Sequence, residues 1–186
     1  MTTARGRRNG LLPAVIQRSL TGHPTTRHLT RAEARAVLDA MLTYPWPPHQ
    51  ITVAARNRAV MVLAAKANLH GHWLAKLTWE DIRREAPVGV LLRSGGLRVL
   101  VLADDEVLQT VDTWRVAVTA VLGREPSGAE PLFPQLGHWP RAGKPPARLR
   151  PMVSNHFVKL VRGALAQLGV PPQARSLYAL RGSLVE

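Results

Sequence analysis

The feature that most constrains the fold of this chain is a short β-hairpin pattern placed among helical stretches. Residues 88–92 and 97–102 are rich in valine and leucine, and Ser94-Gly95-Gly96 lies between them. Two β-prone runs joined by a glycine-containing turn predict an antiparallel hairpin. Because the rest of the chain has helical periodicity, the sequence predicts an α+β domain that is mostly helical, with one small antiparallel sheet.

The stretches before the hairpin carry both the apolar spacing and the end signals of helices. Thr30 and Glu33 have the spacing of a capping box, which predicts that the first long helix opens at Thr30. A second helix is predicted over residues 54–67, and a short one near residues 71–77.

The stretches after the hairpin predict two more helices separated by a long loop over residues 123–151. Ser154 is predicted to cap the second of these helices, and Gly169 to close it. Asp104 or Asp105 caps the first, whose apolar stripe comprises Val107, Leu108, Val111, Trp114, Val118, Val121 and Leu122.

The charge of the chain is strongly positive and unevenly distributed. Its 186 residues contain 25 Lys and Arg against 12 Asp and Glu, which gives a net charge of +13. No acid occurs from residue 131 to residue 185. Such a balance favours a polyanionic partner, and duplex nucleic acid fits it better than an acidic membrane, because no basic amphipathic helix with an aromatic face is apparent. General basicity from an arginine-rich proteome is the alternative.

Composition also narrows the chemistry. The chain has no cysteine, which excludes disulfides and thiolate metal sites. His70 and His72 lack the spacing of a helical metal pair and have no acid or cysteine beside them, so we expect neither a metal nor a cofactor. No apolar run approaches the length of a membrane span.

Six short strings, in chain order, carry a resemblance to one protein family. They are Leu29-Thr-Arg-Ala-Glu33, Arg56-Asn-Arg-Ala-Val60, Ala67-Asn-Leu-His-Gly-His-Trp-Leu-Ala-Lys-Leu-Thr-Trp-Glu-Asp-Ile82, Arg98-Val-Leu-Val-Leu102, Pro131-Leu-Phe-Pro134 and Leu177-Tyr-Ala-Leu-Arg181. Together they resemble the catalytic domain of the tyrosine recombinases, the phage-type integrases. The resemblance implies the fold of that domain, duplex DNA as partner, and a cytoplasmic, nucleoid-associated protein encoded by a bacterium, a phage or another mobile element.

The resemblance also implies a chemistry: a tyrosine attacks a DNA phosphate, two arginines clamp the phosphate oxygens, and a lysine on the hairpin is the general acid. At these positions the chain departs from the family. His70 replaces the first arginine, Trp73 the following glutamate, and Gly96 falls at or near the lysine. Tyr178 replaces the histidine of the last string, and only Arg181 is retained.

No tyrosine matches the nucleophile, because the family places it well beyond the position of Arg181. We therefore expect residues 1–28 to be a basic arm and residues 29–186 to be a catalytic-domain-like module without the nucleophile region, with no catalytic residues. The expected DNA contacts are Arg181, His70, Arg93, Arg98, Lys144, Arg148, Arg150, Ser154, Asn155, His156, Lys159 and Arg162.

Three functions follow from these observations. The first is a catalytically inactive, integrase-derived protein that binds duplex DNA in a regulatory or architectural role. The second is a truncated or split recombinase completed by a partner chain, against which the substituted clamp residues argue. The third is a protein-interaction module that pairs with itself or with an active integrase and modulates it.

Overall fold

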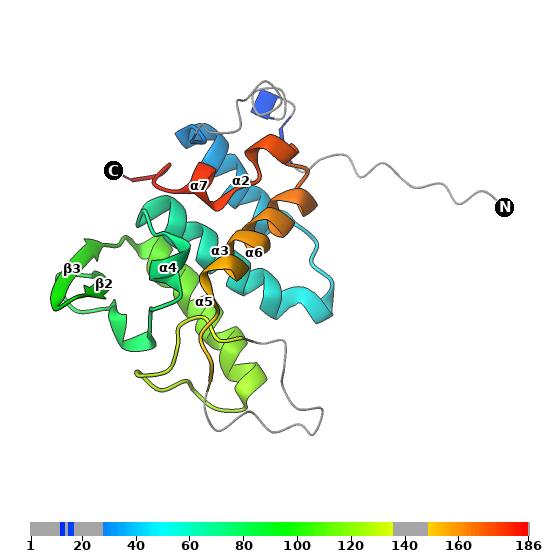
Figure 1. Cartoon of the computed structure of the whole chain (residues 1–186). Helices are drawn as coiled ribbons and strands as arrows, with labels where there is room; N and C mark the ends of the chain where they lie inside the picture. Colours follow the sequence, from blue (N-terminus) through cyan, green and yellow to red (C-terminus); the bar gives the residue numbers. More distant parts are fainter. Residues whose placement is uncertain (1–11, 14, 17–27, 136–148, 186) are drawn as a thin grey trace.

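The computed structural model describes residues 12–13, 15–16, 28–135 and 149–185 (Figure 1). The helices are α2 (Arg31–Thr43), α3 (Ile51–Lys66), α4 (Gly71–Leu74), α5 (Asp105–Leu122), α6 (Ser154–Gln167) and α7 (Leu177–Leu180). Short 3-10 helices occupy Pro48–Gln50, Trp79–Asp81 and Pro172–Ala174, and the strands are β1 (Ile82–Arg83), β2 (Gly89–Ser94) and β3 (Leu97–Leu102). This is the predicted α+β, mostly helical arrangement.

The predicted hairpin is confirmed. Strands β2 and β3 pair antiparallel in the order β1-β2-β3, and the turn consists of Gly95 at φ 54° and Gly96 at φ 84°. Two consecutive residues at positive φ form the turn that suits the twist of a two-residue hairpin, and glycine adopts both without steric strain. Strand β1, which was not predicted, adds two residues to the other edge of β2.

The first long helix is confirmed together with its cap, because the side chains of Thr30 and Glu33 each accept a hydrogen bond from the other's backbone N–H. Helix α3 begins earlier than predicted, at Ile51, since the 3-10 turn before it runs directly into the helix. Helix α5 begins after the Asp104 cap, as predicted.

The predicted cap at Ser154 is wrong. The N-cap of α6 is Val153, which makes no side-chain capping bond, and Ser154 is already helical. The reason lies in packing: a Cβ atom added to Gly71 would lie 2.9 Å from the Ser154 hydroxyl oxygen, so this side chain faces α4.

The core surrounds α3, which packs against α2, α5, α6 and α7 (Figure 1). Residues 59–65 of α3 are buried on every side, so α3 is a central helix and not an amphipathic surface helix. Trp114 of α5 is fully buried and donates its indole N–H to the Leu132 carbonyl at 2.7 Å. The apolar stripe of α5 is otherwise as predicted, except that Val121 is exposed.

The segment after α7 is held against the end of α3. The Gly182 N–H donates to the Ala64 carbonyl at 2.9 Å, and the Leu184 N–H donates to the Ala65 carbonyl at 3.0 Å. These bonds fix the position of Arg181, which precedes them. Within the described part of the chain, every helix is too short or too polar to cross a membrane.

Candidate nucleic-acid interface

His70 and Arg181, the positions that the resemblance aligns with the two clamp arginines, lie side by side. Asn68 adopts the left-handed conformation at φ 54° and turns the chain out of α3, which leaves His70 as the N-cap of α4. Arg181 ends α7, and its Nη1 atom lies 2.7 Å from His70 Nδ1. The fold therefore brings together two side chains that are 111 residues apart in sequence.

Three further side chains, His28, His72 and Tyr178, lie around this pair. We call the five residues His28, His70, His72, Tyr178 and Arg181 the histidine–arginine cluster. The Arg181 guanidinium carbon lies 5.3 Å from the centre of the Tyr178 ring, which in turn lies 4.6 Å from the His28 ring. His28 Nδ1 is 3.1 Å from the Arg181 carbonyl oxygen, and the rings of His70 and His72 are 5.3 Å apart.

The cluster contains one permanent positive charge. Partial burial lowers the pKa of His70 below its ordinary value of 6.5, and the charges of Arg181 and His72 lower that pKa further. His70 is therefore mostly neutral at neutral pH and accepts a hydrogen bond from Arg181. An anion placed beside the pair would reverse this balance, because it favours the protonated imidazole.

Tyr178, which replaces the family's histidine, is 52% exposed. Its ring lies over the Arg181 guanidinium and stiffens it by a cation–π contact. The Arg181 Nε atom is buried and has no hydrogen-bond partner among the described residues. A buried donor without a partner is costly, and it is a position where a ligand or water would be stabilised.

Helix α6 packs against α4, which places its first turns next to the histidine–arginine cluster. Asn155, Lys159 and Arg162 are exposed, and their i, i+4, i+7 spacing puts them on one face of the helix. His156 is also exposed, whereas Ser154 is half-buried against Gly71. Of the five predicted positions on α6, four are thus available to a ligand.

The two hairpin arginines lie directly opposite each other, yet their surroundings differ. Arg93 Nε lies 2.9 Å from the buried carboxylate of Asp81, and Arg93 Nη2 lies 3.2 Å from the carboxylate of Glu80. Arg98 is exposed and has no acidic partner within the described ranges. Gly96 sits in the turn between them at positive φ.

Arg150 is exposed just before the bridge that joins Pro134 to Pro151. Lys144 and Arg148, also predicted to contact DNA, lie outside the described residues. Arg150, Lys159 and Arg162 form no ion pair with any described acid, because the acids of the structure lie on other elements. We call Arg150, Lys159, Arg162 and Arg181, which share the absence of an ion pair with a described acid, the acid-free cations.

Sequence reasoning placed His70, Tyr178 and Arg181 at family positions but did not single out His28. His28 meets Arg181 across 153 residues, and it has no local signal except its place just before the first capping box. His72 was considered only as a metal ligand. Within the described ranges, no three histidine or carboxylate side chains are arranged so that they could hold a metal ion.

Comparison with known proteins finds similarity in structure and not in sequence. No protein-family model and no curated protein matches the chain. Among solved structures, XerH site-specific recombinase bound to its difH substrate, before cleavage, superposes with a TM-score of 0.61 at 16% identity over 84% of this chain and 41% of XerH. The post-cleavage complex with palindromic difH gives a TM-score of 0.62 at 16% identity, over 88% and 42%.

The chain thus spans about two fifths of the length of XerH. The alignment with the pre-cleavage complex includes 84% of this chain at a TM-score of 0.61. Together with the hairpin between helices and the meeting of His70 and Arg181, it establishes that this chain has a tyrosine-recombinase-like fold.

Proposed function

We propose that this protein binds duplex DNA through the acid-free cations and the histidine–arginine cluster. The observation that carries the proposal is the contrast in pairing: Lys159 and Arg162 are exposed without a described acidic partner, in a stretch of sequence that has no acid until residue 186. Exposed arginine and lysine side chains in a fixed array neutralise phosphates and release counterions. XerH, which has a similar fold, is itself described in complex with DNA substrate.

Each predicted contact has a distinct place in this proposal. Arg181 and His70 contact one phosphate, while Asn155, His156, Lys159 and Arg162 follow the backbone along α6. Arg98 contacts DNA from the hairpin tip, and Arg93 supports the hairpin through Asp81. Ser154 contributes through its packing against α4. Arg150, Lys144 and Arg148 each add a phosphate contact, and the basic residues of the arm over residues 1–28 add non-specific affinity.

The same proposal holds that the protein does not cut DNA and has a regulatory or architectural role. Phosphoryl transfer to a tyrosine needs an activated nucleophile and a clamp that gains strength as negative charge develops. Here one clamp position is the largely neutral His70, the hairpin lysine position falls at or near Gly96, and Tyr178 lies against Arg181 as a stacking ring.

Fluorescence anisotropy with a labelled duplex at several salt concentrations tests DNA binding. We expect the logarithm of affinity to fall linearly with the logarithm of salt concentration, by about 0.9 for each phosphate neutralised. A flat salt response, or no binding at low salt, would contradict the proposal and favour the protein-interaction module.

A nicked suicide duplex analysed on a denaturing gel tests inactivity. We expect no covalent adduct. A shifted band that disappears in Tyr178→Phe would instead establish a rewired active site, and a band that appears only when a second integrase chain is added would establish the split recombinase.

A further inference from the structure

Strand β3 lies at the edge of the sheet, and along one of its sides the backbone N–H and C=O groups have no strand partner in the described part of the chain. It pairs with β2 on one side, and no described segment pairs with it on the other. The Ala103 N–H donates to the Val88 carbonyl at 3.3 Å. Along an antiparallel strand, successive residues direct their backbone N–H and C=O groups alternately to the two sides, so Val99 and Val101 direct theirs toward β2 as Ala103 does. The N–H and C=O groups of Arg98, Leu100 and Leu102 therefore point away from the sheet and are available for pairing.

The exposed edge is also apolar. Leu97 is 72% exposed, Val99 54% and Leu102 71%. Natural proteins protect such edges with lysine, proline, bulges or a covering segment, because an apolar edge strand pairs readily with another chain. Strand β3 contains no lysine or proline, and its pairing with β2 is regular over six residues without a bulge. Within the described residues, no strand covers this edge.

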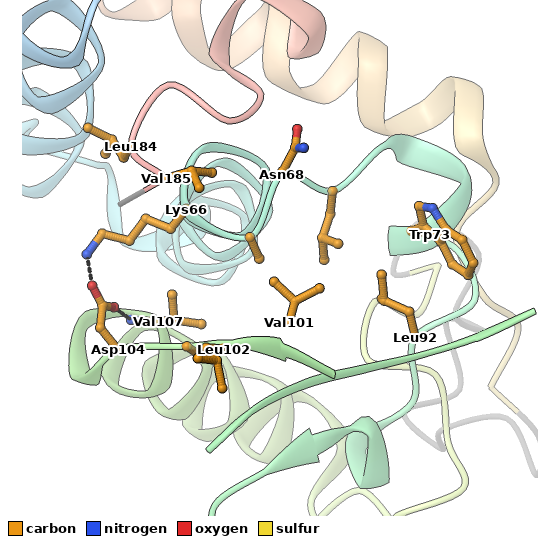
Figure 2. Close-up of a pocket in the computed structure, with 13 residues that line it drawn as sticks. Lys66, Asn68, Trp73, Leu92, Val101, Leu102, Asp104, Val107, Leu184 and Val185 are labelled. Carbon is orange, nitrogen blue, oxygen red and sulfur yellow. Dashed lines mark hydrogen bonds and ion pairs between the residues drawn. The ribbon is translucent and has the colours of Figure 1, made fainter. Parts of the chain in front are cut away.

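An open cavity of about 630 Å³ adjoins the same strand (Figure 2). Leu92, Val101 and Leu102 line it from the sheet, and Leu184 and Val185 line it from the chain segment after α7. Figure 2 shows the ion pair of Lys66 with Asp104 at one end of this cavity. A strand added to β3 would extend the sheet beside this cavity.

The charges at the two ends of β3 have opposite signs. Arg98 lies near the beginning of the strand, and Asp105 lies just beyond its end; both are exposed, and neither has a partner among the described residues. The neighbouring acids Asp104 and Glu106 are already paired with Lys66. In an antiparallel pair with a copy of the same strand, the end that carries Arg98 in one copy lies beside the end that carries Asp104 and Asp105 in the other.

We propose that β3 pairs antiparallel with β3 of a second copy of this chain, and that the two sheets join into one. With Val101 on the two-fold axis, Leu100 of one copy lies opposite Leu102 of the other, so the outward backbone groups satisfy each other. The same register places Arg98 directly opposite Asp104 of the second copy. A two-fold interface requires a surface that is complementary to itself, and a strand with an arginine at one end, acids at the other and apolar residues between meets that requirement.

The test is sedimentation equilibrium of the full chain without DNA, over a wide range of protein concentration. We expect a reversible monomer–dimer equilibrium in the unmodified protein. In Leu102→Pro, the outward N–H is lost while the bonds to β2 stay, since proline is tolerated on the free side of an edge strand. We expect this variant to be monomeric with an unchanged circular dichroism spectrum. The matched control is Val116→Asp, which alters an equally exposed valine on α5 and should leave the equilibrium unchanged.

A charge reversal gives a second, independent readout should Leu102→Pro not fold. Arg98→Glu should weaken the dimer by about fivefold, because it replaces an attraction between Arg98 and Asp104 by a repulsion at both ends of the paired strands. A protein that is monomeric at all concentrations, or a dimer that both Leu102→Pro and Arg98→Glu leave intact, would overturn the proposal.

Discussion

Two regions of this molecule use positive charge in opposite ways. Around α5, the cations are held by acids: Glu106 lies 2.8 Å from both Lys66 and Arg35, and Arg124 lies 2.6 Å from Glu130. On α6, the cations Lys159 and Arg162 are exposed and have no described acid nearby. The comparison teaches that net charge does not locate a binding surface. The pairing of each cation locates it, because a guanidinium or ammonium that is paired with a carboxylate is already neutralised within the fold.

The largest expected effect comes from removing the unpaired cations. Replacement of Lys159 and Arg162 together by alanine should weaken duplex binding by about tenfold or more and reduce the salt slope by about 1–2. The free energy of unfolding should change by less than about 0.5 kcal/mol, because both side chains are exposed. Anisotropy titration and thermal denaturation measure the two quantities.

The matched control removes the same number of cations from the paired region. Arg115 lies 2.8 Å from Glu125, and Arg124 lies 2.6 Å from Glu130. The double variant Arg115→Ala, Arg124→Ala should leave the salt slope unchanged. Equal losses of affinity in the two double variants would mean that the distinction between the regions is irrelevant to binding.

The next effect concerns stability in the paired region. Glu106→Gln leaves Lys66 and Arg35 without their shared carboxylate and should lower the free energy of unfolding by about 1–2 kcal/mol, with DNA affinity unchanged or slightly higher. The control is Glu85→Gln, at an exposed carboxylate with no partner in the described ranges. If the two variants melted alike, the ion-pair network would contribute nothing measurable.

The same network predicts the pH dependence of stability. Hydrogen bonds from Lys66 and Arg35 outweigh the opposing effect of burial and hold the pKa of Glu106 below its ordinary value of 4.5. A carboxyl with a depressed folded-state pKa stabilises the fold above its unfolded pKa, and this contribution is lost as the pH falls through the folded value. Chemical denaturation between neutral pH and pH 3, compared in the unmodified protein and Glu106→Gln, should therefore converge toward the acidic end.

A smaller effect is expected at the histidine–arginine cluster. A phosphate beside His70 favours the protonated imidazole, and burial and neighbouring charge hold the pKa of His70 in the free protein below its ordinary value of 6.5, so DNA affinity should rise by about threefold as the pH falls below 6.5. His70→Gln should lose this component of the pH dependence. His49→Gln, at an exposed histidine of the 3-10 turn before α3, should retain it. A pH profile that His70→Gln leaves unaltered would remove His70 from the interface.

The last prediction compares Arg93 and Arg98, which lie opposite each other on the hairpin, by the effect of their replacement on DNA affinity and on stability. Arg98→Ala should weaken DNA binding by about threefold at protein concentrations below self-association and leave stability unchanged. Arg93→Ala should instead lower stability by about 0.5–1 kcal/mol, because Arg93 contacts Asp81 and Glu80. An exchange of these two outcomes would reverse the assignment of paired and unpaired cations.

Local signals in the sequence were sufficient for much of the fold. The turn at Gly95 and Gly96, the capping box at Thr30 and the cap at Asp104 each depend on residues within a few positions of one another, and all three were predicted. The cap at Ser154 failed because Gly71, from a different helix, determines where that side chain lies. Strand β1 has two residues, too few for a detectable alternation.

The candidate site also has features that could be predicted from the sequence and features that depend on packing. The resemblance placed His70 and Arg181 at related positions, and the structure brings them into contact. The pairing of Arg93 with Asp81 and the approach of His28 to Arg181 depend on how distant segments pack, and no periodicity or motif encodes them locally. Sequence reasoning therefore identified which residues carry charge, and only the structure separated the cations that are neutralised from those that are not.

The hydrogen bonds that join Gly182 and Leu184 to Ala64 and Ala65 have a kinetic consequence. The last carbonyls of a helix lack donors from their own helix, and here two of those of α3 receive them from residues far along the chain. The final turn of α3 and the segment that carries Arg181 must therefore open as one cooperative unit. In hydrogen–deuterium exchange, the amides of Gly182 and Leu184 should be labelled at the same rate, and a duplex bound at Arg181 should slow both together.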